Sequence, residues 1–258
     1  MNPPTITPTR ECSKCGQIAA YEPIITPDGA DLHSLIPFVC NDCNHHAEAE
    51  EIRAAKARAN ERRAHKWRTV IPQKYRETDI RHPDFPRDLF ESLRSHPLTD
   101  SVALIGKAGR GKTRLLALLA KRAIATDLTV GWCPANSFQW AATREFDRQD
   151  GQDARQWLRR WHTADVLFLD DLGKHRWTDA VESAFFGLIE ARAARMLPTH
   201  WSMNPAPDDV PDLLARIRQE PSDLLARALD PFGEAIRRPR FAPIISRLLD
   251  DTTLIPVT

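Results

Sequence analysis

The chain has 258 residues, a length that predicts one sizeable core and one smaller module and excludes a single small scaffold. Hydrophobic residues make up 42% and charged residues 28%, and no apolar run approaches the roughly 18 residues of a membrane span. We therefore expect no contact with a membrane. The net charge of +1, from 36 basic and 35 acidic residues, identifies no class of partner, so only local patches are informative.

The amino-terminal segment holds four of the five cysteines and too few apolar runs to build a core unaided. These cysteines form two C-x-x-C pairs, and four thiolates at this spacing can surround a tetrahedral Zn²⁺. The alternatives are a redox pair or two unrelated pairs, and a redox pair would belong near a βαβ pattern, which is absent here. We therefore predict a zinc-binding module over residues 1–45. The candidate zinc ligands are Cys12, Cys15, Cys40 and Cys43, with His45 or His46 as possible substitutes.

The first ten residues, MNPPTITPTR, lack the basic start and apolar core of a secretory signal. We expect a cytoplasmic protein whose cysteines do not form disulfides. The fifth cysteine, Cys133, lies inside an apolar run and is interpreted as a core residue.

Residues 46–98 predict a basic helix followed by a linker. Residues 46–68 are rich in Ala, Glu, Lys and Arg, which is typical of a helix, but they carry no apolar stripe. Seven Lys or Arg residues between 52 and 68 spread around this helix, so a solvated connector and a nucleic-acid footprint both remain open. Four prolines between 69 and 98 predict an extended segment that links or wraps the core.

Alternating apolar runs and helical patterns begin near residue 99. Near-continuous apolar strands separated by helices predict a parallel sheet covered on both faces, which is α/β architecture over residues 99–258. The predicted strands are 101–106, 128–133, 165–170, 199–203 and 253–257, and the clearest predicted helices are 112–125 and the segment that begins near Val181.

The stretch GKAGRGKT fits the pattern G-x-x-x-x-G-K-[ST] and lies between a predicted strand and a predicted helix. Gly106 and Gly111 allow the backbone to turn its N–H groups toward a phosphate. Lys112 would neutralise the β- and γ-phosphates of ATP, and the Thr113 hydroxyl would bind Mg²⁺. This context favours a phosphate-binding loop over a chance glycine turn. The predicted nucleotide contacts are Gly106, Lys107, Ala108, Gly109, Arg110, Gly111, Lys112, Thr113 and Arg114.

The run VLFLDD places Asp170 and Asp171 at the carboxyl end of another predicted strand. In α/β proteins this edge of the sheet forms the ligand crevice. Asp170 would hold Mg²⁺ through water, and Asp171 would orient or deprotonate an attacking water. Alone, the pair would be interpreted as two solvated acids at a turn, but together with the glycine-rich loop it favours these roles in binding Mg²⁺ and orienting water.

Residues 136–162, between the second and third predicted strands, interleave aromatic and basic side chains. Such a pattern is used to bind single-stranded nucleic acid. Because several of the aromatic residues also keep helical spacing, the tryptophans are predicted to pack inward. The residues concerned are Phe138, Trp140, Trp157 and Trp161, with Arg144, Arg148, Arg155, Arg159 and Arg160.

The motifs GKAGRGKT, LFLDDLGK and PTHWSMNP, in this order and spacing, resemble the AAA+ ATPases of the DnaC-type helicase-loader family, which includes transposition-helper ATPases. VIPQKYRETDI, at 70–80, resembles the stretch that precedes the core in that family, so the resemblance covers residues 70–258. It implies a P-loop NTPase sheet flanked by helices, joined to a small zinc-ribbon-like module. It also implies that residues 136–162 face single-stranded DNA.

The resemblance implies two further site residues. Asn204 would be the sensor that positions water near the γ-phosphate, although a turn Asn before a proline is the alternative. Arg247, in IISRLLDD, would be an arginine finger that reaches a neighbouring subunit, with Arg227 as its competitor. The family's second sensor arginine has no obvious counterpart, although the pair Arg237 and Arg238 could substitute.

The predicted function is therefore an ATP-dependent loader of a replicative helicase. It would hydrolyse ATP to ADP and phosphate with Mg²⁺, and would assemble as a homo-oligomer on single-stranded DNA. Three alternatives remain open: a transposition-helper ATPase, a zinc-dependent adaptor in which nucleotide is a structural ligand, and a small-molecule kinase, for which a zinc module offers no role.

Overall fold

The structure is a computed structural model that describes residues 8–27, 29, 31, 36–78, 80–81, 85–230 and 241–257. The chain divides into two compact units, Met1–Arg62 and Arg63–Thr258, and the division falls inside one long helix. The expected boundaries near residues 45 and 98 stay a prediction. Arg237 and Arg238 lie outside the described residues, so the question of a second sensor arginine stays open.

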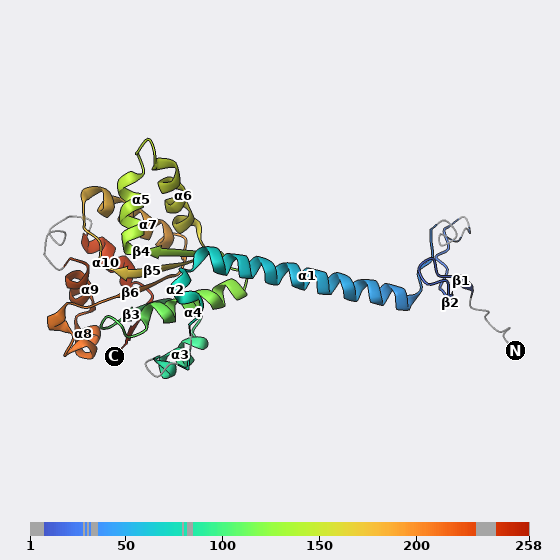
Figure 1. The fold of residues 1–258 in the computed structure, drawn as a ribbon, viewed down its shortest axis with the longest axis horizontal. Coiled ribbons are helices and arrows are strands. Elements are labelled where there is room, and N and C mark those ends of the chain that lie inside the picture. The colour runs from blue at the N-terminus through green and yellow to red at the C-terminus, as the bar shows by residue number, and fades with distance from the viewer. Residues whose placement is uncertain are drawn as a thin grey trace. The chain divides into compact units, whose positions relative to one another are not determined.

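The first unit combines a small two-stranded sheet with the first part of a long helix. Strand β1 (Thr9–Glu11) pairs antiparallel with β2 (Ile18–Ala20), and helix α1 (Asn41–Val70) begins within this unit (Figure 1). Among the described residues of this unit, only Cys12 and Cys40 are buried. An apolar core of this size cannot offset the entropy of ordering the segment, as the sequence indicated.

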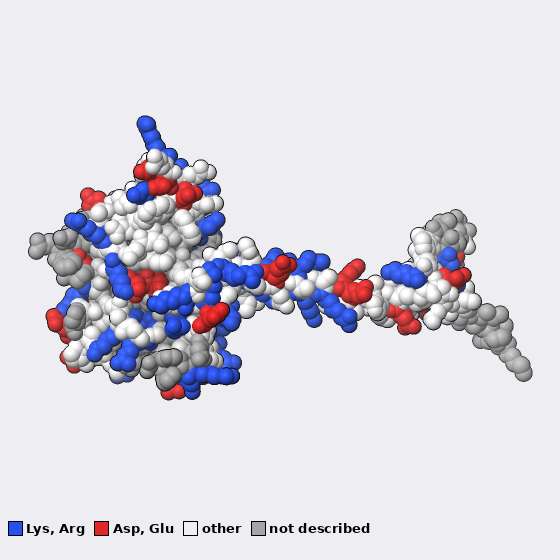
Figure 2. All heavy atoms as spheres, viewed as in Figure 1, with Lys and Arg blue, Asp and Glu red and all other residues white. Residues whose placement is uncertain are grey.

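Helix α1 confirms the helix predicted at 46–68 and extends it at both ends. None of its residues is buried. Figure 2 shows Lys and Arg side chains along both edges of the helix, with acidic residues between them, which agrees with the absence of a single basic stripe. No helix in the described part of the chain is both long enough and apolar enough to cross a membrane.

The second unit contains a five-stranded sheet in which every pairing is parallel. The strands lie in the order β4-β5-β6-β3-β7, so the first strand in sequence, β3, lies between β6 and β7. All five predicted strands are confirmed to within two residues at either end. The strands are β3 (Ser101–Ile105), β4 (Val130–Pro134), β5 (Val166–Leu172), β6 (Thr199–Met203) and β7 (Thr252–Pro256).

Helices cover both faces of this sheet, as Figure 1 shows. Alternate residues of each strand point to opposite faces. In β3, Val102 and Leu104 pack with helix α4 (Lys112–Ala125), whereas Ala103 and Ile105 pack with the helices on the other face. The helices of the core are α4 (Lys112–Ala125), α5 (Ala135–Arg144), α6 (Gly151–Thr163), α7 (Asp179–Ala193), α8 (Leu213–Gln219), α9 (Pro221–Leu229) and α10 (Phe241–Leu249), with a 3-10 turn, η2 (Pro207–Asp209).

The segment that follows α1 corrects one expectation. It was predicted to be extended, but it contains helices α2 (Gln73–Arg76) and α3 (Arg87–Arg94), both of which contact α4. Ile71, Phe85 and Leu93 are buried in the α4 side of the core. Proline is tolerated at the start of a helix, where no N–H is needed, so Pro72 and Pro86 precede these helices without breaking them. The segment wraps the core as two short helices.

Candidate nucleotide-binding site

The loop between β3 and α4 has the backbone that a phosphate cradle requires. Gly109 and Gly111 both have φ of +82°, a conformation that residues with a side chain rarely adopt. Gly106 is glycine for a different reason, because an added Cβ would lie 2.0 Å from the carbonyl oxygen of Val257. Residues 107–110 are exposed, so the loop is open to a ligand. The loop also meets the start of α4, whose unpaired N–H groups attract anions.

Lys112 is buried at the first position of α4, and its ammonium is fully occupied. Its Nζ donates hydrogen bonds to the carbonyl oxygens of Gly106 and Lys107, both at 2.7 Å, and to Oδ1 of Asn204 at 2.8 Å. Burial lowers the pKa of Lys112 to about 8, while the charge of Asp171 opposes this shift. The structure therefore brings the predicted lysine and the predicted sensor asparagine into direct contact.

The carboxylate of Asp170 lies at the carboxyl end of β5 and faces the start of α4. Its Oδ1 accepts hydrogen bonds from Thr113 Oγ1 at 2.9 Å and from Ser202 Oγ at 2.8 Å. Burial raises the pKa of Asp170, and the two hydroxyl donors oppose this shift. A hydroxyl and a carboxylate side by side are the oxygen ligands that Mg²⁺ takes beside nucleotide phosphates, so these residues fit the predicted metal.

Asp171 follows on an irregular part of the strand. The pairing of β5 with β6 shifts register between Leu169 and Leu172, and Asp171 has φ of +58°. A bulge of this kind turns a side chain away from the regular alternation. The Asp171 N–H donates to Ser202 Oγ at 3.0 Å, and the Asp171 side chain remains partly exposed. It is thus placed beside the cradle and accessible to water.

Sequence reasoning missed Ser202, which links the two aspartates. Its hydroxyl donates to Asp170 and accepts from the Asp171 N–H. The signal was present in the sequence, because Ser202 lies two residues before Asn204 in the run THWSMN, and residues two apart on a strand share a face.

Arg247 is not part of this site within one chain. It lies in the last turn of α10, just before β7 begins, and β7 starts beside the first residue of β3. The glycine-rich loop follows the opposite end of β3. Arg247 instead pairs with Glu190 at 2.8 Å and with Asp250 at 3.3 Å. The competitor, Arg227, lies 3.4 Å from Asp209.

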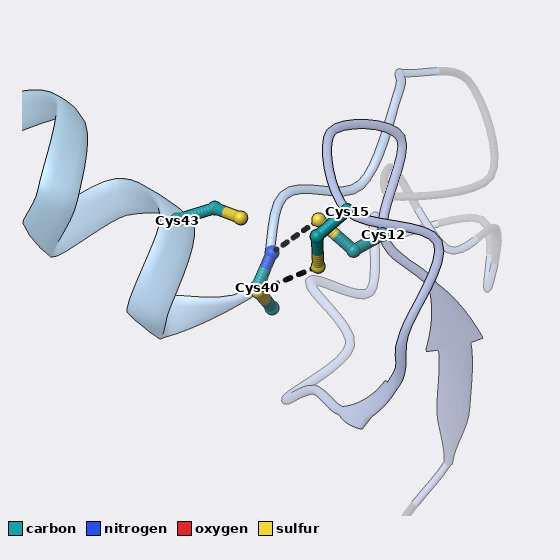
Figure 3. Close-up of side chains that lie close together, drawn as sticks. All are labelled: Cys12, Cys15, Cys40 and Cys43. Carbon is teal, nitrogen blue, oxygen red and sulfur yellow. Dashed lines mark hydrogen bonds between the residues drawn. The ribbon is translucent and has the colours of Figure 1, made fainter.

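The four predicted cysteines converge in the first unit. Cys12 and Cys15 follow β1, Cys40 precedes α1, and Cys43 lies in its first turn, and Figure 3 shows their sulfurs turned toward one another. All four Sγ atoms lie within 4.8 Å of one another. The two candidate substitutes, His45 and His46, are exposed and lie near Glu48 and Glu50.

The electrostatics of the cluster favour a metal. The backbone N–H of Cys40 donates to Cys12 Sγ at 3.3 Å, and such bonds lower the pKa of Cys12 to about 6. In contrast, hydrogen bonds of the protonated Cys43 thiol with Cys40 and Cys15 raise the pKa of Cys43 to about 12. Four thiols in contact cannot all ionise unless a cation compensates their charge, and Zn²⁺ with four sulfur ligands is the usual solution. Cys133, by contrast, is buried in the core as predicted.

The inserted segment forms an α5–α6 hairpin, and the prediction that its tryptophans pack inward is only partly right. Phe138 and Trp161 are buried. Trp140 and Trp157 are 38% and 41% exposed. Both line a cavity of about 460 Å³ together with Trp132 and Trp161. The guanidinium of Arg160 lies 5.4 Å from the centre of the Trp157 ring. The hairpin therefore presents stacking surfaces beside cations.

Comparison with known sequences agrees with this site. Residues 44–197, more than half of the chain, match the family described as IstB-like ATP binding protein. No protein of curated function matches the chain significantly.

The chain is also similar to solved structures. DnaI is 19% identical with a TM-score of 0.50, and the match covers 75% of this chain and 96% of DnaI. The DnaC helicase loader is 14% identical with a TM-score of 0.48, covering 75% and 99%. DnaA from Aquifex aeolicus, bound to AMPPCP, is 14% identical with a TM-score of 0.47, covering 72% and 50%, so this chain spans half of that protein. The likeness to DnaI confirms the predicted fold.

Proposed function

Since the chain belongs to the family of IstB-like ATP-binding proteins, we propose that it is an ATP-hydrolysing switch that acts on single-stranded DNA and loads a replicative helicase. The observation that carries the proposal is the contact of Lys112 with Asn204 and of Thr113 with Asp170, beside the carboxyl ends of the three adjacent strands β5, β6 and β3. A lysine, a polar sensor and a carboxylate around a glycine-rich loop are the parts that phosphoryl transfer to water requires.

Each side chain has a distinct task in hydrolysis. Lys112 neutralises the phosphates, and Thr113 with Asp170 would hold Mg²⁺, which would screen charge on the β- and γ-phosphates. Asp171 accepts a hydrogen bond from the attacking water and so orients it. Asn204, which Lys112 contacts at 2.8 Å, would sense the γ-phosphate.

Arg247 would act in the nucleotide site of a neighbouring subunit. It lies at the amino ends of β3 and β7, whereas the glycine-rich loop lies at the carboxyl end of β3, so it cannot reach the loop of its own chain. An arginine that stabilises the transferred phosphoryl group in trans requires neighbouring subunits. We therefore include assembly into a homo-oligomer on DNA in the proposal.

The α5–α6 hairpin supports the choice of DNA as a ligand. Its exposed tryptophans offer faces for bases, and its basic residues can follow a phosphate backbone. Helix α6 carries Arg155, Arg159 and Arg160 against one acidic residue, Asp153. The zinc module, with its four thiols, would fold around Zn²⁺ and engage the helicase.

ATP binding and turnover test the central claim. The full-length protein is expected to bind a labelled ATP analogue with Mg²⁺ and to hydrolyse ATP. Lys112→Ala should abolish binding, because the phosphates lose their ammonium. Asp171→Asn should retain binding and lower kcat by about 100-fold or more, the usual contribution of a base. Lys56→Met, an exposed change on α1, serves as the control. Full turnover in Asp171→Asn would refute the role of Asp171, whereas ATP binding without turnover in the wild-type protein would make nucleotide a structural ligand only.

The partner requires a separate experiment. The protein, with ATP and Mg²⁺, is expected to retain a replicative helicase during purification, and Lys112→Ala should lose it. Recovery of a transposase in place of a helicase would replace this part of the proposal with the transposition-helper alternative.

A further inference from the structure

The turn after β5 carries a lysine that hydrolysis does not require. Asp171 and Gly173 have φ of +58° and +92°, and the Lys174 N–H donates to the Asp171 carbonyl at 3.2 Å. This tight turn brings the Lys174 side chain back over the site. Its Nζ donates to Asp171 Oδ2 at 2.7 Å. The ammonium therefore occupies one oxygen of the carboxylate that would orient the attacking water.

The turn is anchored, so the lysine is held near the carboxylate. A Cβ on Gly173 would lie 2.3 Å from the carbonyl oxygen of Ala228, which shows how closely the turn approaches the end of α9. Trp177 Nε1 donates to the carbonyl of Leu229 at 2.7 Å, and His175 is buried between these contacts. These contacts lie on both sides of Lys174 and hold its backbone, whereas its side chain is half exposed.

The charge of Lys174 also reaches the other groups of the site. Burial is the main cause of the lowered pKa of Lys112, and the charge of Lys174 lowers it further. The same charge opposes the rise in the pKa of Asp170. At the same time the two partners remain open to solvent, with Lys174 50% and Asp171 38% exposed. Because both side chains are exposed, the ion pair is weak, and a competing anion can separate the two charges at a modest cost in free energy.

We propose that Lys174 is a positioning residue that restrains hydrolysis by holding Asp171 away from the attacking water. The inference rests on the proposed ATPase function. The restraint is relieved when an anionic group, such as a backbone phosphate of the bound strand, draws the ammonium away. The carboxylate then has both oxygens available to accept the hydrogen bond from water.

Steady-state ATP turnover by the full-length protein without DNA tests this restraint. Lys174→Met should raise kcat by about 3- to 5-fold, the range that a half-exposed ion pair allows, with KM unchanged. Lys174→Arg, which keeps the charge, should restore the wild-type rate. Lys56→Met, the loss of an exposed charge on α1, should leave kcat unchanged. Stimulation by single-stranded DNA should be smaller in Lys174→Met than in wild type.

Two results overturn the restraint, and they differ from a failure of the proposed function. If wild type turns over ATP and Lys174→Met matches it, the ion pair does not limit hydrolysis. If Lys174→Met lowers kcat or raises KM, the lysine contacts the nucleotide instead. If no variant hydrolyses ATP although all bind it, hydrolysis itself is refuted, and the restraint falls with it.

Discussion

Nζ of Lys112 donates a hydrogen bond to Oδ1 of Asn204, 2.8 Å away, and so joins the first turn of α4 to the end of β6. The two residues lie 92 positions apart in the sequence. They meet because β3 and β6 are neighbours in the sheet and both end at the same edge. A γ-phosphate entering the cradle would compete with Asn204 for the ammonium, so binding of ATP is expected to free the amide to contact water or phosphate.

Asn204 variants should separate sensing from binding. Asn204→Ala is expected to leave the affinity for ATP within a few-fold of wild type and to lower kcat by about 10- to 100-fold, because water loses its orienting amide. Asn204→Asp should weaken ATP binding instead, since a carboxylate would hold Lys112 and repel the phosphates. Titration with a fluorescent ATP analogue, beside turnover, checks both. The exposed Asn136→Ala is the control, and unchanged kcat in Asn204→Ala would contradict the sensor role.

The cysteine cluster should hold one Zn²⁺ per chain. Cys12→Ser is expected to lose the metal and unfold the first unit, because Cys12 and Cys40 are its only buried described residues. Elemental analysis gives the zinc content, and limited proteolysis reports the loss of protection before residue 62. Cys133→Ala, which lies in the core of the other unit, should keep its zinc. A metal-free protein with a protease-resistant first unit would contradict the assignment.

Mixing inactive variants tests whether Arg247 acts between subunits. Arg247→Ala and Asp171→Asn are each expected to hydrolyse ATP slowly when alone. An equimolar mixture should recover part of the wild-type rate, because some interfaces combine an intact finger with an intact Asp171. The same mixture made with Arg227→Ala in place of Arg247→Ala discriminates between the two candidates. A mixture of Arg247→Ala and Asp171→Asn that is no faster than its components argues against a shared site.

The second unit should lose stability below neutral pH. Burial lowers the pKa of His175 from 6.5 to about 4, so the unfolded state binds a proton first as pH falls. Folding therefore favours the neutral imidazole. The stability that this histidine contributes is complete above pH 6.5 and is lost progressively as the pH falls toward 4. From pH 7.5 to 5.5 the loss is on the order of 1 kcal/mol for one such histidine.

His175→Phe should reduce this dependence, since a phenyl ring keeps the contact with Trp177 and has no proton to gain. Urea unfolding at the two pH values measures the effect. His200, whose pKa burial lowers to about 3, should maintain the rest of the slope. His65→Gln, an exposed change on α1, is the control. An identical pH dependence in His175→Phe and wild type would refute the assignment.

The exposed tryptophans should bind bases rather than phosphates. Trp157→Ala is expected to weaken binding of an oligothymidine by about 5- to 30-fold, within the usual range for stacking. The loss should vanish with a strand of abasic sites, and the salt dependence should stay the same because phosphate contacts remain. Fluorescence anisotropy measures both. Phe146→Ala, 88% exposed but outside the tryptophan-lined cavity, is the control. An equal loss on the abasic strand would exclude stacking.

In the linker and in the α5–α6 hairpin, the sequence did not predict correctly which residues form a helix or are buried. The prolines of residues 69–98 predicted an extended chain, but Arg87–Arg94 forms a helix because Leu93 can be buried against α4. Likewise, the spacing of Trp157 and Trp161 predicted that both point inward, whereas only Trp161 is buried, with its Nε1 donating to the carbonyl of Trp132. Which side of a helix meets the core depends on neighbours that are distant in sequence.

The positions of the five core strands along the chain, the glycine-rich loop, the paired aspartates and the four cysteines could all be identified from the sequence alone. Each depends on residues close together in the chain, where backbone geometry and periodicity leave few choices. Only the tertiary structure decided that Lys112 meets Asn204, that Ser202 joins the aspartates, and that Lys174 covers Asp171. These contacts depend on strand order and on a bulge in β5, which local sequence does not specify because they are set by packing across the whole sheet.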